Sequence, residues 1–229
     1  MGQNDLAQKN LILYPDVFAD TINALFHDGH KIVREKELRH APTESLYYAI
    51  GGELKNQLQD VAMYVIKENQ IKICYLLENQ MRVERKMVLR KAGYEGAVYR
   101  RQFEEKEIYP VVCAVLYWGK GHWKAPCSIK ELIQKKLTDN SVKAVENYMD
   151  DIRLQVFEMT HLSQEVRKRF QSDMRVVVDY LAEGKDYKPG QHILKHPEAF
   201  LQMIYALTGD LRYEELLKDR KSTRLNSSH

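Results

Sequence analysis

Apolar residues recur at helical spacing in several stretches of the chain, and each stretch predicts an amphipathic helix. The first begins at Tyr14-Pro15-Asp16 and ends near Asp28-Gly29, because Pro and an acidic residue favour a helix start and Gly favours its end. Its apolar face is formed by Val17, Phe18, Ile22, Leu25 and Phe26. Further helices are predicted at Arg85–Gln102, with interruptions near Gly93 and Gly96, and at Ser128–Lys136, Ser163–Glu183 and His196–Leu207.

Runs of apolar and β-branched residues predict the strands. Two of them, Asp60–Lys67 and Ile71–Gln80, are separated only by Glu68-Asn69-Gln70, which predicts a hairpin of long and largely buried strands. Residues 36–58 show no clear pattern apart from a turn at Gly51-Gly52. Further strands are predicted at Ile108–Trp118, Ile152–Glu158 and, as a short one, Lys31–Arg34.

The predicted elements follow the order helix, hairpin, helix, strand, helix, strand, helix, helix. This alternation predicts an α/β fold in which helices cover both faces of a mixed central sheet. The sequence has no internal repeat and no low-complexity linker. We therefore expect residues 1–218 to form one domain, with a core at about residues 10–185 and a C-terminal helical part at residues 186–218.

The last residues, 219–229, differ from the rest of the chain in composition. They read DRKSTRLNSSH, contain one apolar residue and show no periodicity. A reverse translation of this string matches a widely used sequencing adapter, so we expect it to be an artefact and not native sequence. It holds three basic residues and one acidic residue, which leaves the rest of the chain with a formal charge of +1 out of the total of +3.

Composition excludes several classes of protein. Hydrophobic residues at 44% and charged residues at 29% are ordinary globular values and exclude a wholly disordered chain. The longest apolar run, Val111–Trp118, has eight residues, whereas a membrane-spanning helix needs roughly 18–20. The N-terminus lacks the features of a secretory signal, and three cysteines cannot build a disulfide framework. We therefore expect a cytoplasmic protein with no membrane contact.

The predicted hairpin brings two carboxylates together. If its turn is centred on Asn69, Asp60 lies opposite Glu78 on one face of the sheet, and Gln80 lies two residues further along that face. Opposed like charges are destabilising unless a cation lies between them. A divalent metal ion bound by both carboxylates, by a backbone carbonyl such as that of Asn79 and by waters would satisfy this need, and oxygen ligands suit Mg²⁺. Alternatively, the two acids are solvated at a strand end, and a register slip of one residue would separate them.

A strongly basic segment follows the acidic pair. Residues 82–101 contain seven basic residues and only two acidic ones, in a chain that is otherwise nearly neutral. Such a segment beside a metal site suits a polyanion whose scissile phosphate must reach the metal, although a solvated helix face would look the same. The combination favours phosphodiester hydrolysis. The basic residues are Arg82, Arg85, Lys86, Arg90, Lys91, Arg100 and Arg101, and we expect the first five to bind DNA.

An acidic residue that opens one strand, followed by Glu-x-Gln inside the next, resembles the PD-(D/E)xK nuclease pattern with Gln in the place of Lys. More specifically, the chain resembles the Rpn family of recombination-promoting nucleases, also described as YhgA-like putative transposases, over roughly residues 10–185. This resemblance implies a restriction-endonuclease-like fold and a metal-dependent DNA endonuclease associated with recombination or transposition. The matching segments are Pro15–Asp20, Asn23–Gly29, Gln59–Val61, Leu76–Gln80, Pro110–Gly119 and Trp123–Leu132.

Carried over residue by residue, the resemblance implies that Asp60 and Glu78 bind Mg²⁺ or Mn²⁺. Gln80 stands where many relatives have a catalytic Lys. Its neutral amide cannot act as a cation or a base, but it can orient the attacking water or a phosphate oxygen. An acidic residue of the first helix often joins such sites, and Asp20 is the candidate.

The sequence departs from the family pattern at two positions. Gln59 stands where Arg is usual, and Met81 stands where Ser or Thr is usual, which puts the substrate contacts in question more than metal binding. The resemblance implies DNA as the partner, and a homodimer is also expected. Two other hypotheses remain. An inactive DNA-binding or protein-interaction relic would have little reason to keep Asp60, Glu78 and Gln80 together. A structural or toxin–antitoxin partner without a nucleic-acid role would have its basic residues dispersed around the helix.

Overall fold

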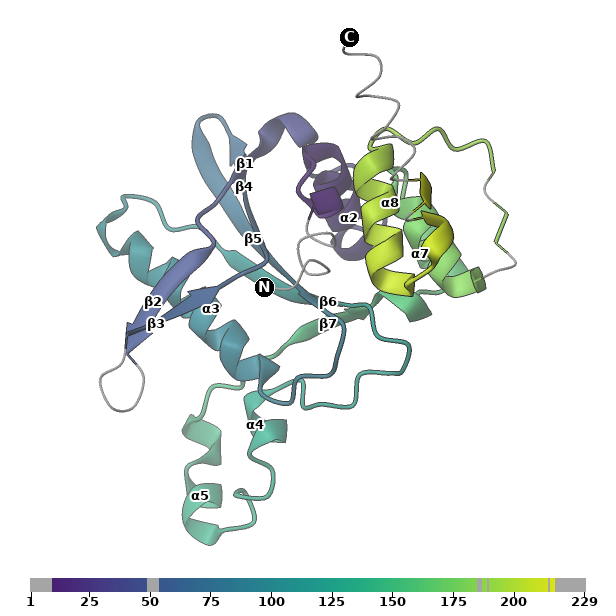
Figure 1. The fold of residues 1–229 in the computed structure, drawn as a ribbon. Coiled ribbons are helices and arrows are strands. Elements are labelled where there is room, and N and C mark those ends of the chain that lie inside the picture. The colour runs from purple at the N-terminus through teal and green to yellow at the C-terminus, as the bar shows by residue number, and fades with distance from the viewer. Residues whose placement is uncertain (1–9, 49–53, 185–186, 189, 214, 217–229) are drawn as a thin grey trace. The chain divides into compact units, whose positions relative to one another are not determined.

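The computed structural model describes residues 10–48, 54–184, 187–188, 190–213 and 215–216 (Figure 1). The predicted adapter-derived tail, residues 219–229, lies outside the described residues. The chain divides into two compact units, one formed by Met1–Leu38 with Met159–His229 and the other by Arg39–Glu158. The expectation of a single domain for residues 1–218 stays a prediction.

The unit Arg39–Glu158 is built on a five-stranded mixed sheet with the strand order β1-β4-β5-β6-β7. Strands β4 and β5 are antiparallel, whereas β5, β6 and β7 run parallel to one another. The fold is therefore mixed α/β, as predicted, and is compatible with a restriction-endonuclease-like fold. The strands are β1 (Leu38–His40), β4 (Val61–Lys67), β5 (Gln70–Gln80), β6 (Val111–Tyr117) and β7 (Gln155–Glu158).

The β4–β5 hairpin has the predicted register near its open end, although its turn is tighter than predicted. Glu68 and Asn69 alone form the turn, both with positive φ, of 53° and 60°. A bulge between Val65 and Ile66 then shifts the pairing by one residue, so that Val61 lies opposite Leu77. Continued by one residue, this register sets Asp60 opposite Glu78.

Helix α3 (Met87–Arg101) covers one face of this sheet (Figure 1). It runs without a break through Gly93 and Gly96, so the predicted interruption is wrong. Both glycines are exposed. Glycine inside a helix costs only about 1 kcal/mol relative to alanine, and the helix buries a continuous side against the sheet that outweighs this cost. The buried residues of the helix are Met87, Val88, Lys91, Tyr94 and Val98.

The core between α3 and the sheet is apolar. It includes Cys74 and Leu76 of β5 and Cys113 and Val115 of β6, so both cysteines are core residues. Residues of the opposite sheet face, such as Leu77, are also fully buried. The strands are therefore buried on both faces, which explains their continuous apolar sequence.

Three segments of this unit differ from the prediction or extend it. Residues 36–58, which show no clear pattern, contain β1 and a separate two-stranded sheet of β2 (Glu44–Tyr48) and β3 (Leu54–Leu58), and η1 (Glu35–Glu37) precedes them in the other unit. Ser128 caps α4 (Ile129–Leu132) by accepting a 3.1 Å bond from the Glu131 backbone, and this helix ends before the predicted end at Lys136. The remaining short helices are α5 (Asn140–Ala144), η2 (Gln102–Glu104) and η3 (Glu146–Tyr148).

The other unit is helical among its described residues. Helices α2 (Pro15–Phe26) and α8 (Pro197–Thr208) begin at proline, as predicted. The predicted strand Lys31–Arg34 is wrong, because these residues form no regular element. The predicted helix Ser163–Glu183 is also wrong, because it is interrupted by a non-helical segment. The elements there are η4 (Met159–His161), α6 (Gln164–Arg167) and α7 (Met174–Glu183).

None of the helices in the described part of the chain is both long enough and apolar enough to cross a membrane.

Candidate active site

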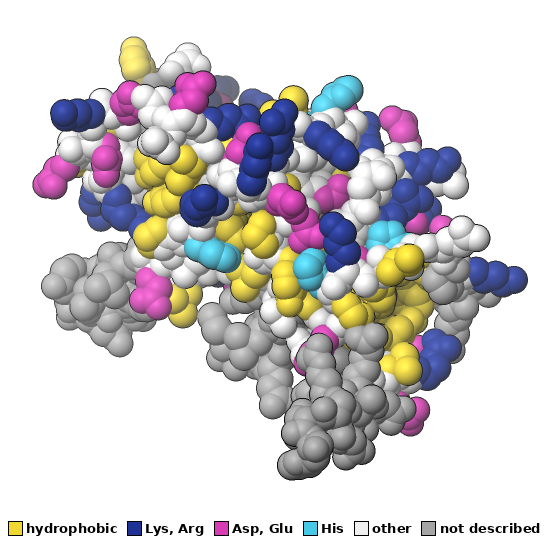
Figure 2. Space-filling model, turned by 90° about the horizontal axis from the view of Figure 1, so that it is seen from above, with side chains coloured by type: hydrophobic (Ala, Val, Ile, Leu, Met, Phe, Trp, Pro, Cys, Tyr) yellow, Lys and Arg dark blue, Asp and Glu magenta, His cyan; other side chains and the backbone are white. Residues whose placement is uncertain are grey.

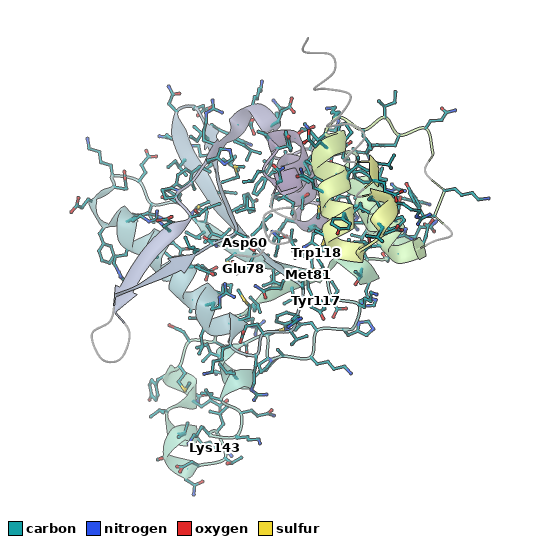
Figure 3. All side chains as sticks on the ribbon, in the orientation of Figure 1. Asp60, Glu78, Met81, Tyr117, Trp118 and Lys143 are labelled. Carbon is teal, nitrogen blue, oxygen red and sulfur yellow. The ribbon has the colours of Figure 1, made fainter. Side chains whose placement is uncertain are left out.

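The carboxylate of Asp60 is held against the strand that carries Glu78. Asp60 lies directly before β4, and its Oδ2 accepts a 2.7 Å hydrogen bond from the backbone N–H of Asn79. Figure 3 labels Asp60 and Glu78 at this end of the hairpin. The structure thus brings together the two carboxylates that the register predicts to be opposed.

Glu78 is the buried member of the pair, with only 2% of its side chain exposed. Its Oε1 accepts a 3.2 Å bond from Gln80 Nε2 and forms a short ion pair with Arg90 Nη2, and the Tyr94 hydroxyl oxygen lies 3.4 Å away. Burial of a carboxylate is unfavourable unless hydrogen bonds and an opposite charge compensate for the lost water. The cation that the sequence requires beside the acidic pair is therefore, in this structure, the guanidinium of Arg90.

Successive side chains of β5 point to opposite faces of the sheet, and this determines which of them share the site. Glu78 and Gln80 lie two residues apart and so point to the same face, the one that α3 covers. Asn79 points to the other face, where its Oδ1 accepts a 2.9 Å bond from Trp118 Nε1. The predicted contribution of Asn79 to a metal site would therefore come from its backbone carbonyl and not from its side chain.

Arg90 and Tyr94 form a second layer, on α3. They are four residues apart and so lie on one side of the helix. The Tyr94 hydroxyl accepts a 2.7 Å bond from Arg90 Nη2 and donates a 2.8 Å bond to the carbonyl of Leu58, two residues before Asp60. Tyr94 thus connects α3 to the segment that leads into β4. Its role was missed in the sequence, although its helical spacing with the buried positions of α3 was a usable signal.

The charges of Asp60 and Glu78 shift the pKa values of Arg90 and Tyr94. Burial lowers the pKa of Arg90, but Glu78, Tyr94 and Asp60 together outweigh it and hold that pKa above its ordinary value. Burial, followed by the charge of Glu78, raises the pKa of the Tyr94 hydroxyl, which stays protonated at neutral pH. Asp60, Glu78, Arg90 and Tyr94 therefore share one electrostatic environment.

A third carboxylate lies along the same edge of the sheet. Gln80 pairs with Tyr117 of β6, and Tyr117 pairs with Glu158 of β7, so these three residues share a face at the carboxyl ends of parallel strands. The Glu158 carboxylate accepts a short bond from the Trp123 backbone N–H and contacts His122 Nδ1 at 2.8 Å. Glu158 was not a predicted site residue, although it ends a predicted strand beside the other strand ends.

The basic residues of the α3 region do not form a single cluster. Arg82, Arg85 and Lys86 are exposed in the segment that precedes the helix. Lys91 is buried and forms a 2.6 Å ion pair with Glu95, so it serves the fold of α3. The exposed Arg100 and Arg101 lie at the far end of the helix, about 20 Å from its start at 1.5 Å per residue. Of the five predicted DNA-binding residues, three are therefore exposed.

The same mixture of charges is visible elsewhere on the molecule. On the face seen in Figure 2, Lys and Arg side chains lie interspersed with Asp and Glu side chains. Contact with a polyanion would therefore have to rest on local groups of basic residues, such as the three before α3.

Asp20, the candidate additional acid, belongs to the other compact unit. Its two carboxylate oxygens accept bonds of 3.0 and 2.9 Å from the Gln171 backbone N–H and one of 2.8 Å from that of Ser172. These contacts hold the segment between α6 and α7 and explain why the predicted helix Ser163–Glu183 is broken there. A role for Asp20 in metal binding stays a prediction.

The donor set of the site suits a hard divalent cation. The Asp60 carboxylate contacts the backbone of the residue after Glu78, and Gln80 adds a neutral amide beside the Glu78 carboxylate. Oxygen ligands of this kind are those that Mg²⁺ and Mn²⁺ take in proteins. The residues present therefore fit a metal ion of this class.

Comparison with known families identifies the chain. Residues 31–186 match the family described as "Putative transposase, YhgA-like". The chain belongs to this family. The YhgA-like match contains Asp60, Glu78, Gln80 and the whole of α3, whereas the quoted motif at Pro15–Gly29 lies before it. Membership of the YhgA-like family supports a transposition-associated role. Among curated proteins and among solved structures, none matches the chain.

Proposed function

We propose that the protein is a metal-dependent DNA endonuclease that hydrolyses phosphodiester bonds in recombination or transposition. The observation that supports this most is the contact of the Asp60 carboxylate with the Asn79 backbone, which holds Asp60 beside Glu78 while Gln80 shares the face of Glu78. Convergence of these three side chains is what a nuclease site of this type requires.

Each residue has a distinct role in the proposal. Asp60, Glu78 and the backbone carbonyl of Asn79 would hold Mg²⁺ or Mn²⁺. When bound, such an ion activates water and stabilises the charge that develops on the phosphate. Gln80 would orient the attacking water or a phosphate oxygen through its amide, because it can neither carry a positive charge nor take up a proton at neutral pH.

The DNA backbone would be held by the exposed cations next to the site. Arg82, Arg85 and Lys86 lie between β5, which carries Glu78, and α3, which carries Arg90. Cations near the scissile phosphate supply affinity that is independent of sequence and sensitive to salt. The proposed partner is therefore DNA bound mainly through its phosphates, and the predicted homodimer stays a prediction.

Two other functions compete with this proposal. An inactive relic is disfavoured by the convergence of Asp60, Glu78 and Gln80. An interaction protein without a nucleic-acid role gains some support from the separation of the exposed basic residues into two groups at the ends of α3.

A plasmid-nicking assay distinguishes among these functions. Supercoiled plasmid is incubated with the full chain in Mg²⁺, Mn²⁺, Ca²⁺ or EDTA, and DNA binding is measured in parallel in Ca²⁺. The proposal predicts nicking in Mg²⁺ or Mn²⁺ and none in EDTA. Binding without nicking in any metal would favour the relic, and the absence of both binding and nicking would favour the interaction protein.

A further inference from the structure

We propose that Arg90 is a displaceable counter-ion of Glu78, which a divalent cation must remove before it can occupy the site. This inference rests on the proposed function, since it assumes that the cation binds at Asp60 and Glu78. It assigns to Arg90 a role beyond DNA contact: Arg90 makes the metal-free protein stable and, for the same reason, weakens its affinity for metal.

The contacts at Glu78 Oε1 carry the argument. The guanidinium of Arg90 donates to this oxygen, and Gln80 Nε2 and the Tyr94 hydroxyl are also within 3.4 Å of it. A metal ion that binds Glu78 must be coordinated by an oxygen lone pair of this same carboxylate and must occupy space next to it. Two positive charges at one buried carboxylate repel each other, so binding of the metal ion opposes the Arg90 contact.

Arg90 can leave this position without unfolding of the helix. Its side chain is 39% exposed, whereas that of Glu78 is 2% exposed, so solvent reaches the guanidinium but hardly reaches the carboxylate. Long basic side chains readily turn a charged end towards water while their methylene groups stay packed. Tyr94 would remain in place, because its hydroxyl donates its proton to the Leu58 carbonyl at 2.8 Å.

Displacement has a thermodynamic consequence. The free energy needed to move Arg90 is subtracted from the intrinsic free energy of metal binding, so the apparent affinity is lower than that of the bare pair of carboxylates. Removal of the guanidinium charge should therefore tighten metal binding while it destabilises the metal-free protein. A residue that merely positions Glu78 for the metal would have the opposite effect on affinity.

The test is a Mn²⁺ titration of the full chain, with free Mn²⁺ followed by its EPR signal, at constant ionic strength and without DNA. The wild type is compared with Arg90→Gln, with the matched control Arg85→Gln and with Asp60→Asn. Arg85→Gln also removes one positive charge, but from an exposed position whose field is screened within about 8–10 Å at 0.1–0.15 M salt. Melting temperatures are recorded with and without Mn²⁺.

We expect Arg90→Gln to bind Mn²⁺ about tenfold more tightly than the wild type, equivalent to about 1.4 kcal/mol. Arg85→Gln should stay within about twofold. Without metal, Arg90→Gln should melt at a lower temperature, and Mn²⁺ should raise its melting temperature more than that of the wild type. Equal or weaker binding by Arg90→Gln would overturn the inference.

The remaining outcomes separate this inference from the proposed function. If Mn²⁺ binds to neither the wild type nor Arg90→Gln, or binds equally to Asp60→Asn, the metal site and this inference both fail. If Arg90→Gln does not fold, Tyr94→Phe decides, because it keeps the ring but removes the hydroxyl that holds Arg90. Tighter Mn²⁺ binding by Tyr94→Phe supports displacement, and unchanged binding overturns it.

Discussion

The carboxylate of Asp60 and the backbone of Asn79 are joined by a hydrogen bond of 2.7 Å, and this bond fixes Asp60 beside Glu78. Asp60 lies directly before β4, and this contact ties its carboxylate to the backbone of β5. Substitutions at the site can therefore be chosen to remove a carboxylate charge while they keep the hydrogen bonds that position it.

Replacement of Asp60 by Asn should leave the stability of the metal-free protein nearly unchanged. The Asn side-chain carbonyl can still accept the Asn79 bond, and Arg90 already compensates the charge of Glu78. We expect the free energy of unfolding to change by less than about 1 kcal/mol. Mn²⁺ should raise the melting temperature of the wild type and leave the variant unmoved, because a ligand that binds only the folded state stabilises it. A thermal melt with and without Mn²⁺ measures both effects. Asp60 would be an ordinary structural residue if the variant were strongly destabilised and Mn²⁺ did not change the melting temperature of the wild type.

Replacement of Gln80 by Ala should lower turnover while metal affinity stays almost unchanged. The neutral Gln80 amide donates one long bond of 3.2 Å to the Glu78 carboxylate, and its loss leaves both carboxylates and their charges in place. We expect nicking to slow by about 10- to 100-fold, in the range of a single lost positioning group. Single-turnover nicking rates and a Mn²⁺ titration measure the two effects. Gln134→Ala, at an exposed position, is the control, and a wild-type rate in Gln80→Ala would remove Gln80 from the mechanism.

The double substitution of Arg85 and Lys86 by Gln should weaken DNA binding equally for all sequences. Each lost phosphate contact reduces the slope of log K against log salt by roughly 0.9 for duplex DNA, so the slope should fall by about 2. Binding isotherms over a range of salt concentrations measure this slope. The matched control replaces Arg100 and Arg101, at the far end of α3, and should leave the slope unaltered. If both double variants lose the same slope, DNA is not held specifically near the site.

Lys91 was predicted to bind DNA together with Arg90, but its burial and its ion pair with Glu95 make it a poor test of DNA contact. Its substitution would change the stability of α3 and so confuse the measurement. Arg85 and Lys86, which are exposed, avoid this difficulty.

The three cysteines should react with thiol reagents at very different rates in the folded protein. Burial raises the pKa of Cys74 to about 12 and that of Cys113 still further, so almost no thiolate exists at pH 8. Burial also raises the pKa of Cys127, but this residue is partly exposed. Because only the thiolate reacts, Ellman's reagent should label one thiol slowly in the native protein and three in denaturant. Rapid labelling of all three before unfolding would contradict the core between α3 and the sheet.

The hairpin shows how far the sequence alone can predict this site. A turn centred on Asn69 implies that Asp60 is opposite Glu78, and the structure reaches the same register by a tighter turn and a bulge at Val65/Ile66. The burial of both strands limits the pairings that are possible, since a slip of one residue would exchange the two faces. The opposition of Asp60 and Glu78 was therefore predicted from periodicity, whereas the bulge that restores this register was not.

The partners of Glu78 could not be predicted in the same way. Arg90 and Tyr94 reach Glu78 only because α3 packs on the face of β5 that carries it, and this is a tertiary contact that local pattern does not encode. The two glycines of α3 suggested a broken helix. Because both are exposed, they leave the packing of the buried side intact, and that packing keeps the helix continuous. The segment around Gln171 was predicted as helix for a similar reason, because the contact from Asp20 that interrupts it comes from a distant part of the chain.

The most direct measurement of the central claim is the initial rate of plasmid nicking by the wild type and by Glu78→Gln, purified in parallel and titrated with Mn²⁺. Glu78→Gln is nearly isosteric and removes the negative charge on which both the metal ion and Arg90 depend. The proposed metal site predicts that the wild-type rate rises and saturates with Mn²⁺ and falls to background in EDTA, while the variant stays at background at every concentration. Equal, Mn²⁺-dependent nicking by Glu78→Gln, or nicking by the wild type in EDTA, would contradict it.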